Sequence, residues 1–347
     1  MVQHSGIGVV LGNLLDRWRQ SPPAAHVCLL GDPALLERWR SPAVSVLRWT
    51  PGIYSPSAAL LPPGLPKGTC AWYSPHYATC LRPGVPLVCH VQDVLHVTHP
   101  TKPGMLPYAR LYFAALRRSA AFVLTSTRHV KVQLQTLLRF PAERVLISGL
   151  GPGFAASLAE GRPAPEGLAA GSYLLGVGIL KSHKNWEFLL RRLAVLGDSV
   201  PPLVAAGLGP QAEELRALAA RCGYGRLRVL GPLPAESLAG LFAGAAALTY
   251  PSLAEGFGLP LIEAMQLGRP VVAADRSPMK EIVGDGGWLF DPDQPESFDR
   301  ALREALGSNG ARADAARRRA GAFTWERTAS VTEEALRRAV SPHELGA

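Results

Sequence analysis

The chain has 347 residues, of which 48% are hydrophobic and 18% charged, and this composition excludes an intrinsically disordered protein. At about 150 residues per domain, the length predicts two domains. No apolar run reaches the roughly 18 residues that a membrane-spanning helix needs, and the first residues lack the pattern of a signal peptide. The five cysteines show no CxxC spacing, which argues against a disulfide framework and a structural zinc site. We therefore expect a soluble cytoplasmic protein.

The net charge of +9 is distributed unevenly along the chain. Residues 1–150 contain 15 Lys and Arg but 5 Asp and Glu, whereas residues 151–347 contain 21 and 22. This asymmetry favours an anionic partner for the first half, such as a membrane surface or a phosphorylated lipid. The alternative is that the basic residues serve only solubility. No zinc finger, RNA-binding or helix-turn-helix pattern is present, so we expect no nucleic-acid partner.

In the first half, short β-rich runs alternate with helical patterns. The predicted strands are residues 26–32, 44–49, 86–93, 121–126 and 145–149. The predicted helices are residues 8–19, 105–118 and 127–138. Buried strands that alternate with helices indicate an α/β domain with a parallel sheet. Residues 156–171, rich in Ala, Gly, Pro and Glu without periodicity, are the expected linker.

The second half repeats this alternation. Its predicted strands are residues 173–178, 203–207, 227–231, 247–251 and 270–275. Its predicted helices are residues 186–196, 211–222, 235–243, 259–267 and 325–338. The fold class is therefore α/β, and we expect two Rossmann-like domains that face a cleft at the carboxyl ends of their strands.

Residues 250–275 carry the most informative pattern, which reads as a strand, a glycine-containing loop and a helix. The backbone N–H groups of Phe257, Gly258 and Leu259 precede or open this helix, where a diphosphate is favoured. Two carboxylates, Glu255 in the loop and Glu263 on the expected first helical turn, would repel a phosphate unless they bind sugar hydroxyls. One carboxylate per sugar fits a nucleotide-sugar. The alternatives are that Glu263 only compensates the helix dipole and that the glycines only form a tight turn.

The frame Ser-x-x-Glu-Gly-Phe-Gly-Leu-Pro-x-x-Glu-Ala-Met, which contains Glu255 and Glu263, resembles the signature of family-four glycosyltransferases. These are retaining enzymes of the GT-B fold, also called group 1 glycosyltransferases. Residues 178–185 resemble the loop after the first strand of that family's second domain. Residues 323–326 resemble the element that opens its last helix, which crosses back to the first domain. The resemblance implies an acceptor-binding domain (1–155), a linker (156–171), a donor-binding domain (172–322) and a returning helix (323–347).

Two segments of the first half also resemble the family. Residues 5–8 resemble its glycine-rich loop, and residues 88–93 resemble the end of one of its strands. The sequence departs from the family where Gln92 stands in place of a frequent His. It also begins almost at the glycine-rich loop, so we expect that the first strand is missing because the start is truncated or misassigned.

The resemblance implies a role for each matching residue. The implied catalytic residues are Lys184, which would hold the donor diphosphate, and Glu255, which would hold the transferred hexose. The alternative is that Lys184 is an ordinary exposed loop lysine. The implied donor-binding residues are Glu263 on the ribose, Phe257, Gly258, Leu259, Gly231 beside the base, Gly6 and Gly8. The implied acceptor-binding residues are Gln92 and Asp93. The family pattern needs no metal and no cofactor, and His183 before Lys184 resembles a subgroup that often uses GDP-mannose.

We therefore expect a retaining glycosyltransferase that moves a hexose, with mannose favoured, to a lipid-linked or polysaccharide acceptor in cell-surface glycan synthesis. One alternative is a catalytically silent nucleotide-sugar-binding subunit that supports a partner transferase. Another is a nucleotide-sugar epimerase, for which no matching carboxylate set is present. A dehydrogenase is disfavoured because no G-x-G-x-x-G follows a first strand. The helix at 105–118 either packs on the sheet or contacts the inner face of an anionic membrane as a peripheral element.

Overall fold

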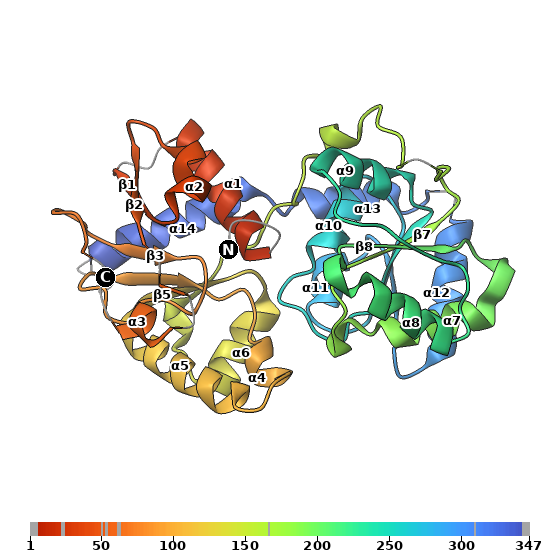
Figure 1. Ribbon diagram of the computed structural model, residues 1–347, viewed down its shortest axis with the longest axis horizontal. Helices are drawn as coiled ribbons and strands as arrows, with labels where there is room; N and C mark the ends of the chain where they lie inside the picture. Colours follow the sequence, from red (N-terminus) through yellow and green to blue (C-terminus); the bar gives the residue numbers. More distant parts are fainter. Residues whose placement is uncertain are drawn as a thin grey trace. The chain divides into compact units, whose positions relative to one another are not determined.

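The structure is a computed structural model that describes residues 6–21, 25–49, 51–52, 55–60, 64–165, 167–308 and 310–341. Its internal contacts divide the chain into a first unit, Met1–Leu150 with Thr324–Ala347, and a second unit, Gly151–Phe323. Each unit contains parallel strands flanked by helices (Figure 1). Among the described residues, no helix is both long and apolar enough to cross a membrane.

The first unit contains the N-terminal elements and the last helix. Its strands are β1 (Val27–Gly31), β2 (Val44–Arg48), β3 (Trp72–Ser74), β4 (Leu87–His90), β5 (Ala120–Thr125) and β6 (Val145–Ile147). Its helices are α1 (Gly6–Gln20), α2 (Pro33–Leu36), α3 (Pro56–Leu60), α4 (Leu95–Thr98), α5 (Met105–Ser119), α6 (Arg128–Leu138) and α14 (Trp325–Val340), with 3-10 turns η1 (Glu37–Trp39) and η2 (Ala142–Arg144).

The strands of the first unit form two separate parallel sheets, a pair β1-β2 and a four-stranded sheet in the order β3-β4-β5-β6. Alternate residues of β4 point to opposite faces of the larger sheet. On one face Cys89 packs with Phe113 of α5 and Leu134 of α6. On the other face Val88 packs against Ala335 of α14. The last helix therefore completes the core of the first unit, as the resemblance implied.

Helix α1 also packs on α14, and a hydrogen bond joins the two helices from Trp18 Nε1 to Glu333 Oε1 at 2.9 Å. The resemblance implied that Gly6 and Gly8 lie in a loop, which is wrong, because both belong to the first turn of α1; the helix predicted from residue 8 begins two residues earlier. The fully buried Val10 and Leu14 lie four residues apart on one face, so packing outweighs the roughly 1 kcal/mol that each glycine costs a helix. Ser5 lies outside the described residues.

The second unit contains the remaining elements. Its strands are β7 (Leu174–Val177), β8 (Leu203–Ala206), β9 (Leu227–Val229), β10 (Ala247–Tyr250), β11 (Val271–Ala274) and β12 (Trp288–Phe290). Its helices are α7 (Trp186–Leu196), α8 (Ala212–Arg221), α9 (Ala235–Gly244), α10 (Leu259–Gln266), α11 (Met279–Val283), α12 (Pro295–Gly307) and α13 (Ala313–Gly321). The 3-10 turns are η3 (Ala156–Ala159), η4 (Ser182–Lys184), η5 (Gly197–Ser199) and η6 (Gly209–Gln211).

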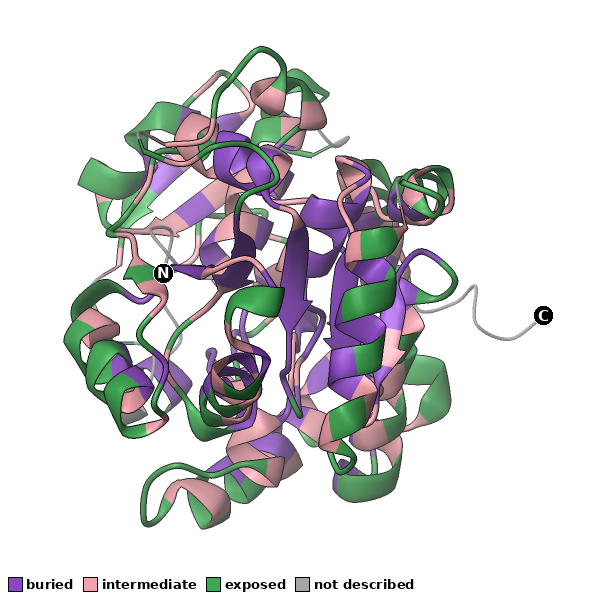
Figure 2. Ribbon diagram, turned by 90° about the vertical axis from the view of Figure 1, so that its right-hand side faces the viewer, coloured by how far each residue is buried: buried purple, intermediate pink, exposed green. Residues whose placement is uncertain are grey.

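These strands form one six-stranded parallel sheet in the order β12-β11-β10-β7-β8-β9. Strands β8, β10 and β11 are buried along their whole length, as expected of a sheet with helices on both faces (Figure 2). Chain order runs outward from β7 in one direction and from β10 in the other. The switch point of the sheet therefore lies between β7 and β10, and ligands of open α/β sheets bind at the carboxyl ends of such strands.

Residues 156–171, which we expected to be a linker, lie in the second unit. The turn η3 contacts α9, and a Cβ on Gly240 of that helix would lie 2.5 Å from the carbonyl oxygen of Pro163. The N–H of Gly171 also donates to the carbonyl of Gly244 at 2.8 Å. The glycines of α9 let the segment lie directly on the helix, and its own composition carries no sign of this contact.

Candidate functional site

Two loops meet at the switch point of the second sheet. Lys184 ends the turn η4 that follows β7, and Glu255 lies in the loop that follows β10. These strands are neighbours in the sheet, so their loops emerge side by side. Lys184 Nζ lies 2.5 Å from Glu255 Oε1, and the side chains are 16% and 10% exposed. The structure thus joins the two residues for which the sequence implied catalytic roles in one largely buried ion pair.

A third group, the hydroxyl of Tyr250 at the end of β10, contacts both members of the ion pair. It donates to Glu255 Oε1 at 2.7 Å and lies 3.5 Å from Lys184 Nζ. Burial alone would raise the pKa of Glu255, but the Lys184 ammonium and the hydrogen bonds from Lys184, Tyr250 and Ser252 hold it below its usual value. Burial and the charge of Glu255 raise the pKa of Tyr250 well above its usual range. At neutral pH Glu255 is therefore an ionised carboxylate and Tyr250 a protonated phenol.

The backbone of both loops explains why these residues meet. The N–H of Leu253, in the second loop, donates to the carbonyl of His183, in the first, at 2.7 Å. Gly178 follows β7 with a φ of +138°, and a Cβ there would lie 3.7 Å from Lys184 Nζ. A glycine at this position leaves space beside the ammonium for a ligand.

Helix α10 begins next to the ion pair. Gly258 is its N-cap with a φ of +102°, and Leu259 and Pro260 form its first positions. Phe257 is buried and packs edge-on against Phe323, with ring centroids 5.4 Å apart, which fixes the entry of the helix. The N–H groups at this helix start and the positive end of the helix dipole form a favourable environment for a phosphate.

Glu263 lies four residues after Leu259, so it occupies the second turn of α10 and not the first turn, as we expected. It is 7% exposed and accepts a hydrogen bond from the N–H of Gly153 at 3.2 Å. Burial raises its pKa to about 7 despite this hydrogen bond. Its charge also contributes to the raised pKa of Tyr250, so it belongs to the same electrostatic environment. A second-turn carboxylate with a pKa near 7 is more than compensation of a helix dipole.

Gly231 follows β9, two strands away from β7, at the same edge of the sheet. It is exposed, and a Cβ added there would meet no atom within 4 Å among the described residues.

The remaining predicted residues follow β4 in the first unit. Asp93 Oδ1 accepts from the N–H of Leu95, the first residue of α4, at 2.9 Å. The buried Gln92 Nε2 finds no hydrogen-bond partner within the described part of the chain. His90 is fully buried, and burial lowers its pKa to about 4, so it does not replace the histidine that Gln92 displaces. A buried amide without a partner is rare and marks Gln92 as a position where a ligand atom or water is expected.

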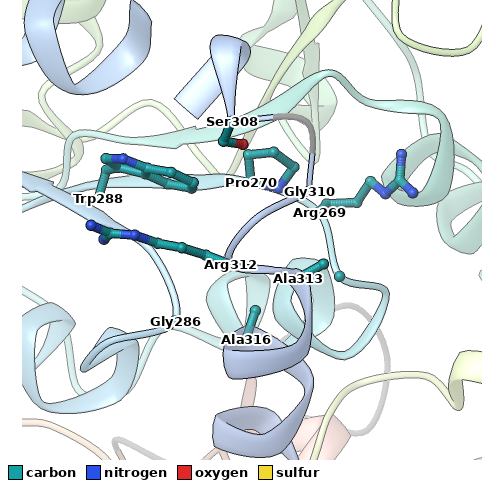
Figure 3. A pocket seen from close by; sticks show the side chains of 10 residues that line it. Arg269, Pro270, Gly286, Trp288, Ser308, Gly310, Arg312, Ala313 and Ala316 are labelled. Carbon is teal, nitrogen blue, oxygen red and sulfur yellow. The ribbon is translucent and has the colours of Figure 1, made fainter. Parts of the chain in front are cut away.

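A small pocket lies at the opposite edge of the second sheet, where β11 and β12 begin (Figure 3). Arg312 lies over the Trp288 ring at 4.6 Å and also donates to the carbonyl of Gly287. The cavity volume of about 10 Å³ admits one water molecule. Pro270 lines this pocket and precedes β11, whereas Lys184 and Glu255 follow their strands, so the pocket is separate from the candidate site.

Sequence reasoning missed Tyr250 and Gly153. Tyr250 resembles any aromatic residue at the end of a buried strand, and only its position five residues before Glu255 hinted at a contact. Gly153 is distant from Glu263 in sequence, and no local pattern joins them. Within the described part of the chain, no group of three or more His, Cys, Asp or Glu residues is placed to hold a metal ion.

Comparison with known sequences points to one family, and comparison with solved structures shows its fold. The family model described as "Glycosyl transferases group 1" matches residues 169–321. The O-antigen chain mannosyltransferase B of Escherichia coli is 32% identical over 232 residues, which cover 63% of this chain and 61% of that protein. A D-inositol 3-phosphate glycosyltransferase of Streptomyces scabiei is 30% identical over 309 residues, covering 78% and 67%. A second such enzyme, from Streptomyces avermitilis, is covered over 49% of its length, so the chain spans about half to two thirds of these relatives.

Solved structures share the fold at lower identity. HepE of Anabaena, solved in complex with UDP-glucose, has a TM-score of 0.74 and 23% identity, with 97% of both chains covered. Sucrose-phosphate synthase of Thermosynechococcus elongatus has a TM-score of 0.74 and 18% identity, covering 97% and 94%. These likenesses confirm the expected GT-B fold.

Proposed function

We propose that this chain, which belongs to the group 1 glycosyltransferases, transfers a hexose from a nucleotide-diphospho-sugar to an acceptor and retains the anomeric configuration. The observation that carries the proposal is the Lys184–Glu255 pair at the switch point, next to the start of α10. Lys184 holds the donor diphosphate, Glu255 binds hydroxyls of the hexose, and Glu263 binds the ribose.

In the transfer, the bond between the anomeric carbon and the diphosphate oxygen breaks, and the acceptor hydroxyl oxygen bonds to the carbon on the same face. The hydroxyl proton passes to the leaving diphosphate. Lys184 and the N–H groups at the start of α10 stabilise the negative charge that develops on the leaving group, without a metal ion. Glu255 orients the sugar for this step through its hydroxyls.

Mannose carried by GDP is the donor we favour. His183 precedes Lys184 as in a subgroup that often uses this donor, and one relative is named a mannosyltransferase. The competing donor is UDP-glucose, since HepE was solved with it. The relative named for the O-antigen chain motivates the acceptor class, a lipid-linked or polysaccharide glycan of the cell surface, whereas the Streptomyces relatives are named for D-inositol 3-phosphate.

Helix α5 supports a peripheral contact with an anionic membrane. Tyr112 and Phe113 face the core, and the Tyr112 hydroxyl is hydrogen-bonded to the backbone of Thr79. The exposed residues are different: Leu111 is 73% and Tyr108 42% exposed. Arg110 and Arg118 are exposed on the same helix, so the helix presents apolar and basic side chains together. Phosphatidylglycerol liposomes should sediment the protein at low salt, and equal sedimentation with neutral liposomes would remove this part of the proposal.

Thermal shift or calorimetry with GDP-, UDP-, ADP- and TDP-sugars tests the donor site. A donor at 100 times its dissociation constant should stabilise the fold by about 2.7 kcal/mol. Lys184→Ala and Glu263→Ala should each lose most of this shift while remaining folded. If no nucleotide-sugar stabilises the folded wild type, the proposed donor site is wrong.

Gln92 favours the second candidate, a silent nucleotide-sugar-binding subunit. An amide forms hydrogen bonds but does not titrate, so it lacks the acid–base capacity of the histidine that frequently stands there. A turnover assay with the matching donor separates the candidates. An active transferase releases the nucleoside diphosphate, whereas a silent subunit binds the donor and releases none.

A further inference from the structure

Tyr250 belongs to the ion-pair cluster, but neither the sequence nor the proposed function assigns it a role. It ends β10 and is 2% exposed, so its hydroxyl is held by the sheet rather than by a mobile loop. Its oxygen lies 2.7 Å from Glu255 Oε1 and 3.5 Å from Lys184 Nζ, and that ammonium also lies 5.5 Å from the centre of the tyrosine ring. Lys184 and Tyr250 therefore bind the same oxygen atom of Glu255.

The hydrogen-bonding capacities fix the direction of each bond. A phenol has one proton, and burial together with the neighbouring Glu255 carboxylate keeps it in place by raising the pKa of Tyr250. The hydroxyl therefore donates to Glu255 and accepts from Lys184. Glu255 Oε1 receives one charged and one neutral donor. The other groups that face this carboxylate are the Ser252 hydroxyl and, through Tyr250, the Glu263 carboxyl.

Binding of the donor changes this balance. A diphosphate carries more charge than a carboxylate and competes with Glu255 for the Lys184 ammonium. When Lys184 turns to the diphosphate, Glu255 loses its counter-charge while it remains largely buried. A buried carboxylate in that state either protonates or moves unless another donor holds it.

We propose that Tyr250 is a positioning residue that holds Glu255 as an oriented carboxylate for the transferred sugar while Lys184 is engaged by the diphosphate. The inference rests on the proposed function and deepens it, because it makes Tyr250 specific for the sugar part of the donor. The nucleoside diphosphate alone does not need Glu255. Tyr250 therefore determines how much more tightly the enzyme binds a nucleotide-sugar than the nucleotide.

Tyr250→Phe tests this with Tyr173→Phe as the matched control. Tyr173 is a fully buried tyrosine of the same unit whose hydroxyl donates to the carbonyl of Leu241 at 2.7 Å. Calorimetry gives the dissociation constants of GDP, UDP and their sugar conjugates, and steady-state assays give kcat and KM. In Tyr250→Phe we expect binding of the free nucleotide within twofold of wild type. We expect kcat and the preference for the sugar conjugate to fall about 10- to 100-fold, the range of a hydrogen bond to a charged group.

The outcomes separate the inference from the proposed function. If the wild type binds neither nucleotides nor nucleotide-sugars, the proposed function and this inference both fail. If the wild type prefers the sugar conjugate and Tyr250→Phe keeps the same preference and the same kcat as Tyr173→Phe, only the role of Tyr250 is wrong.

A comparison of Glu255→Gln with Glu255→Gln/Tyr250→Phe provides the second measurement and does not require the Tyr250→Phe single variant to be stable. In the Glu255→Gln background no buried charge is left to hold, so adding Tyr250→Phe should change the preference for the sugar conjugate less than twofold. A further loss of tenfold or more in the double variant would show that Tyr250 acts independently of Glu255 and would overturn the proposal.

Discussion

Buried polar groups lie at the ends of central strands in both units, but they differ in whether they have hydrogen-bond partners. After β7 and β10 in the second unit, Lys184, Glu255 and Tyr250 bond to one another. At the end of β4 in the first unit, His90 Nε2 and Gln92 Nε2 are buried and have no partner among the described residues. Paired groups stabilise a site before a ligand arrives, whereas unpaired groups cost free energy until something binds them. The proposed donor side, formed by Lys184, Glu255 and Tyr250, is thus paired before a ligand binds. The proposed acceptor side, at His90 and Gln92, is incomplete.

The largest expected loss of stability comes from removing one member of the Lys184–Glu255 ion pair. Lys184→Met leaves Glu255 as a buried charge without its counter-ion, and this should lower the free energy of unfolding by about 3 kcal/mol. The pKa of Glu255 is depressed in the folded wild type, so its stabilising contribution is present above the ordinary value of 4.5 and is lost as the pH falls through the folded value. Urea denaturation at several pH values should therefore show a deficit at neutral pH that shrinks in acid.

Lys184→Met/Glu255→Gln is the control, because it removes both charges. It should recover most of the lost stability at neutral pH. A deficit that is independent of pH, or one that the double variant keeps, would mean that the ion pair contributes packing rather than charge.

Glu263 is the second test of the donor side, because its carboxyl is buried with a pKa of about 7. The folded state then binds more protons than the unfolded state between about pH 4.5 and pH 7, so stability falls as the pH rises through this window. Glu263→Gln resembles the protonated form and keeps an acceptor for Gly153. The stability advantage of this variant over the wild type should grow with pH and reach about 3 kcal/mol at pH 8.

Nucleotide binding gives a second measurement on the same residue. Ribose hydroxyls that donate to Glu263 favour its ionised form, so binding near pH 7 should release a proton. Calorimetry in buffers of different ionisation enthalpy measures this release. Equal proton release by wild type and Glu263→Gln would contradict the assignment of Glu263 to the ribose.

The sequence predicted the site loops of the second unit better than the start of the first unit, and the reason is physical. Lys184, Glu255 and Gly258 lie in short segments whose local backbone determines their positions, and the switch point brings the segments together. The resemblance of residues 5–8 to a glycine-rich loop placed Gly6 and Gly8 in a loop, but the packing of α1 on α14 decides their conformation. Tertiary contacts of this kind leave no local pattern.

Further elements escaped prediction, among them two short strands, the helices α2 to α4 and α11 to α13, and the contacts of residues 156–171. Strands β3 and β12 have only three residues each and depend on their neighbours in the sheet. Residues 156–171 resemble a linker in composition, yet they are held by α9. Short or irregular segments are defined by what they pack against, which a single sequence does not display.

Gly258→Ala tests whether the N-cap of α10, beside the ion pair, requires a glycine because of its positive φ. Its φ is +102°, and a Cβ would lie 2.9 Å from Leu261 Cδ1, so the variant should lose about 2 kcal/mol of stability and weaken donor binding. Gly225→Ala is the matched control, because a Cβ there meets no described atom within 4 Å and its φ is not positive. Similar melting temperatures for the two variants would show that α10 adapts to a side chain at its N-cap.

The smallest expected change in stability concerns the acceptor side, and there the substitution should raise stability rather than lower it. Gln92→Leu removes a half-buried amide whose buried nitrogen has no partner in the part of the chain that the structure describes, so stability should rise by about 1 kcal/mol while turnover with acceptor falls. Gln266→Leu is the matched control in the second unit, where the amide nitrogen donates to the carbonyl of Phe154 at 3.0 Å. That variant should lose about 1 kcal/mol. If both variants are destabilised equally, an ordered water already satisfies Gln92, and the acceptor side is then as complete as the donor side.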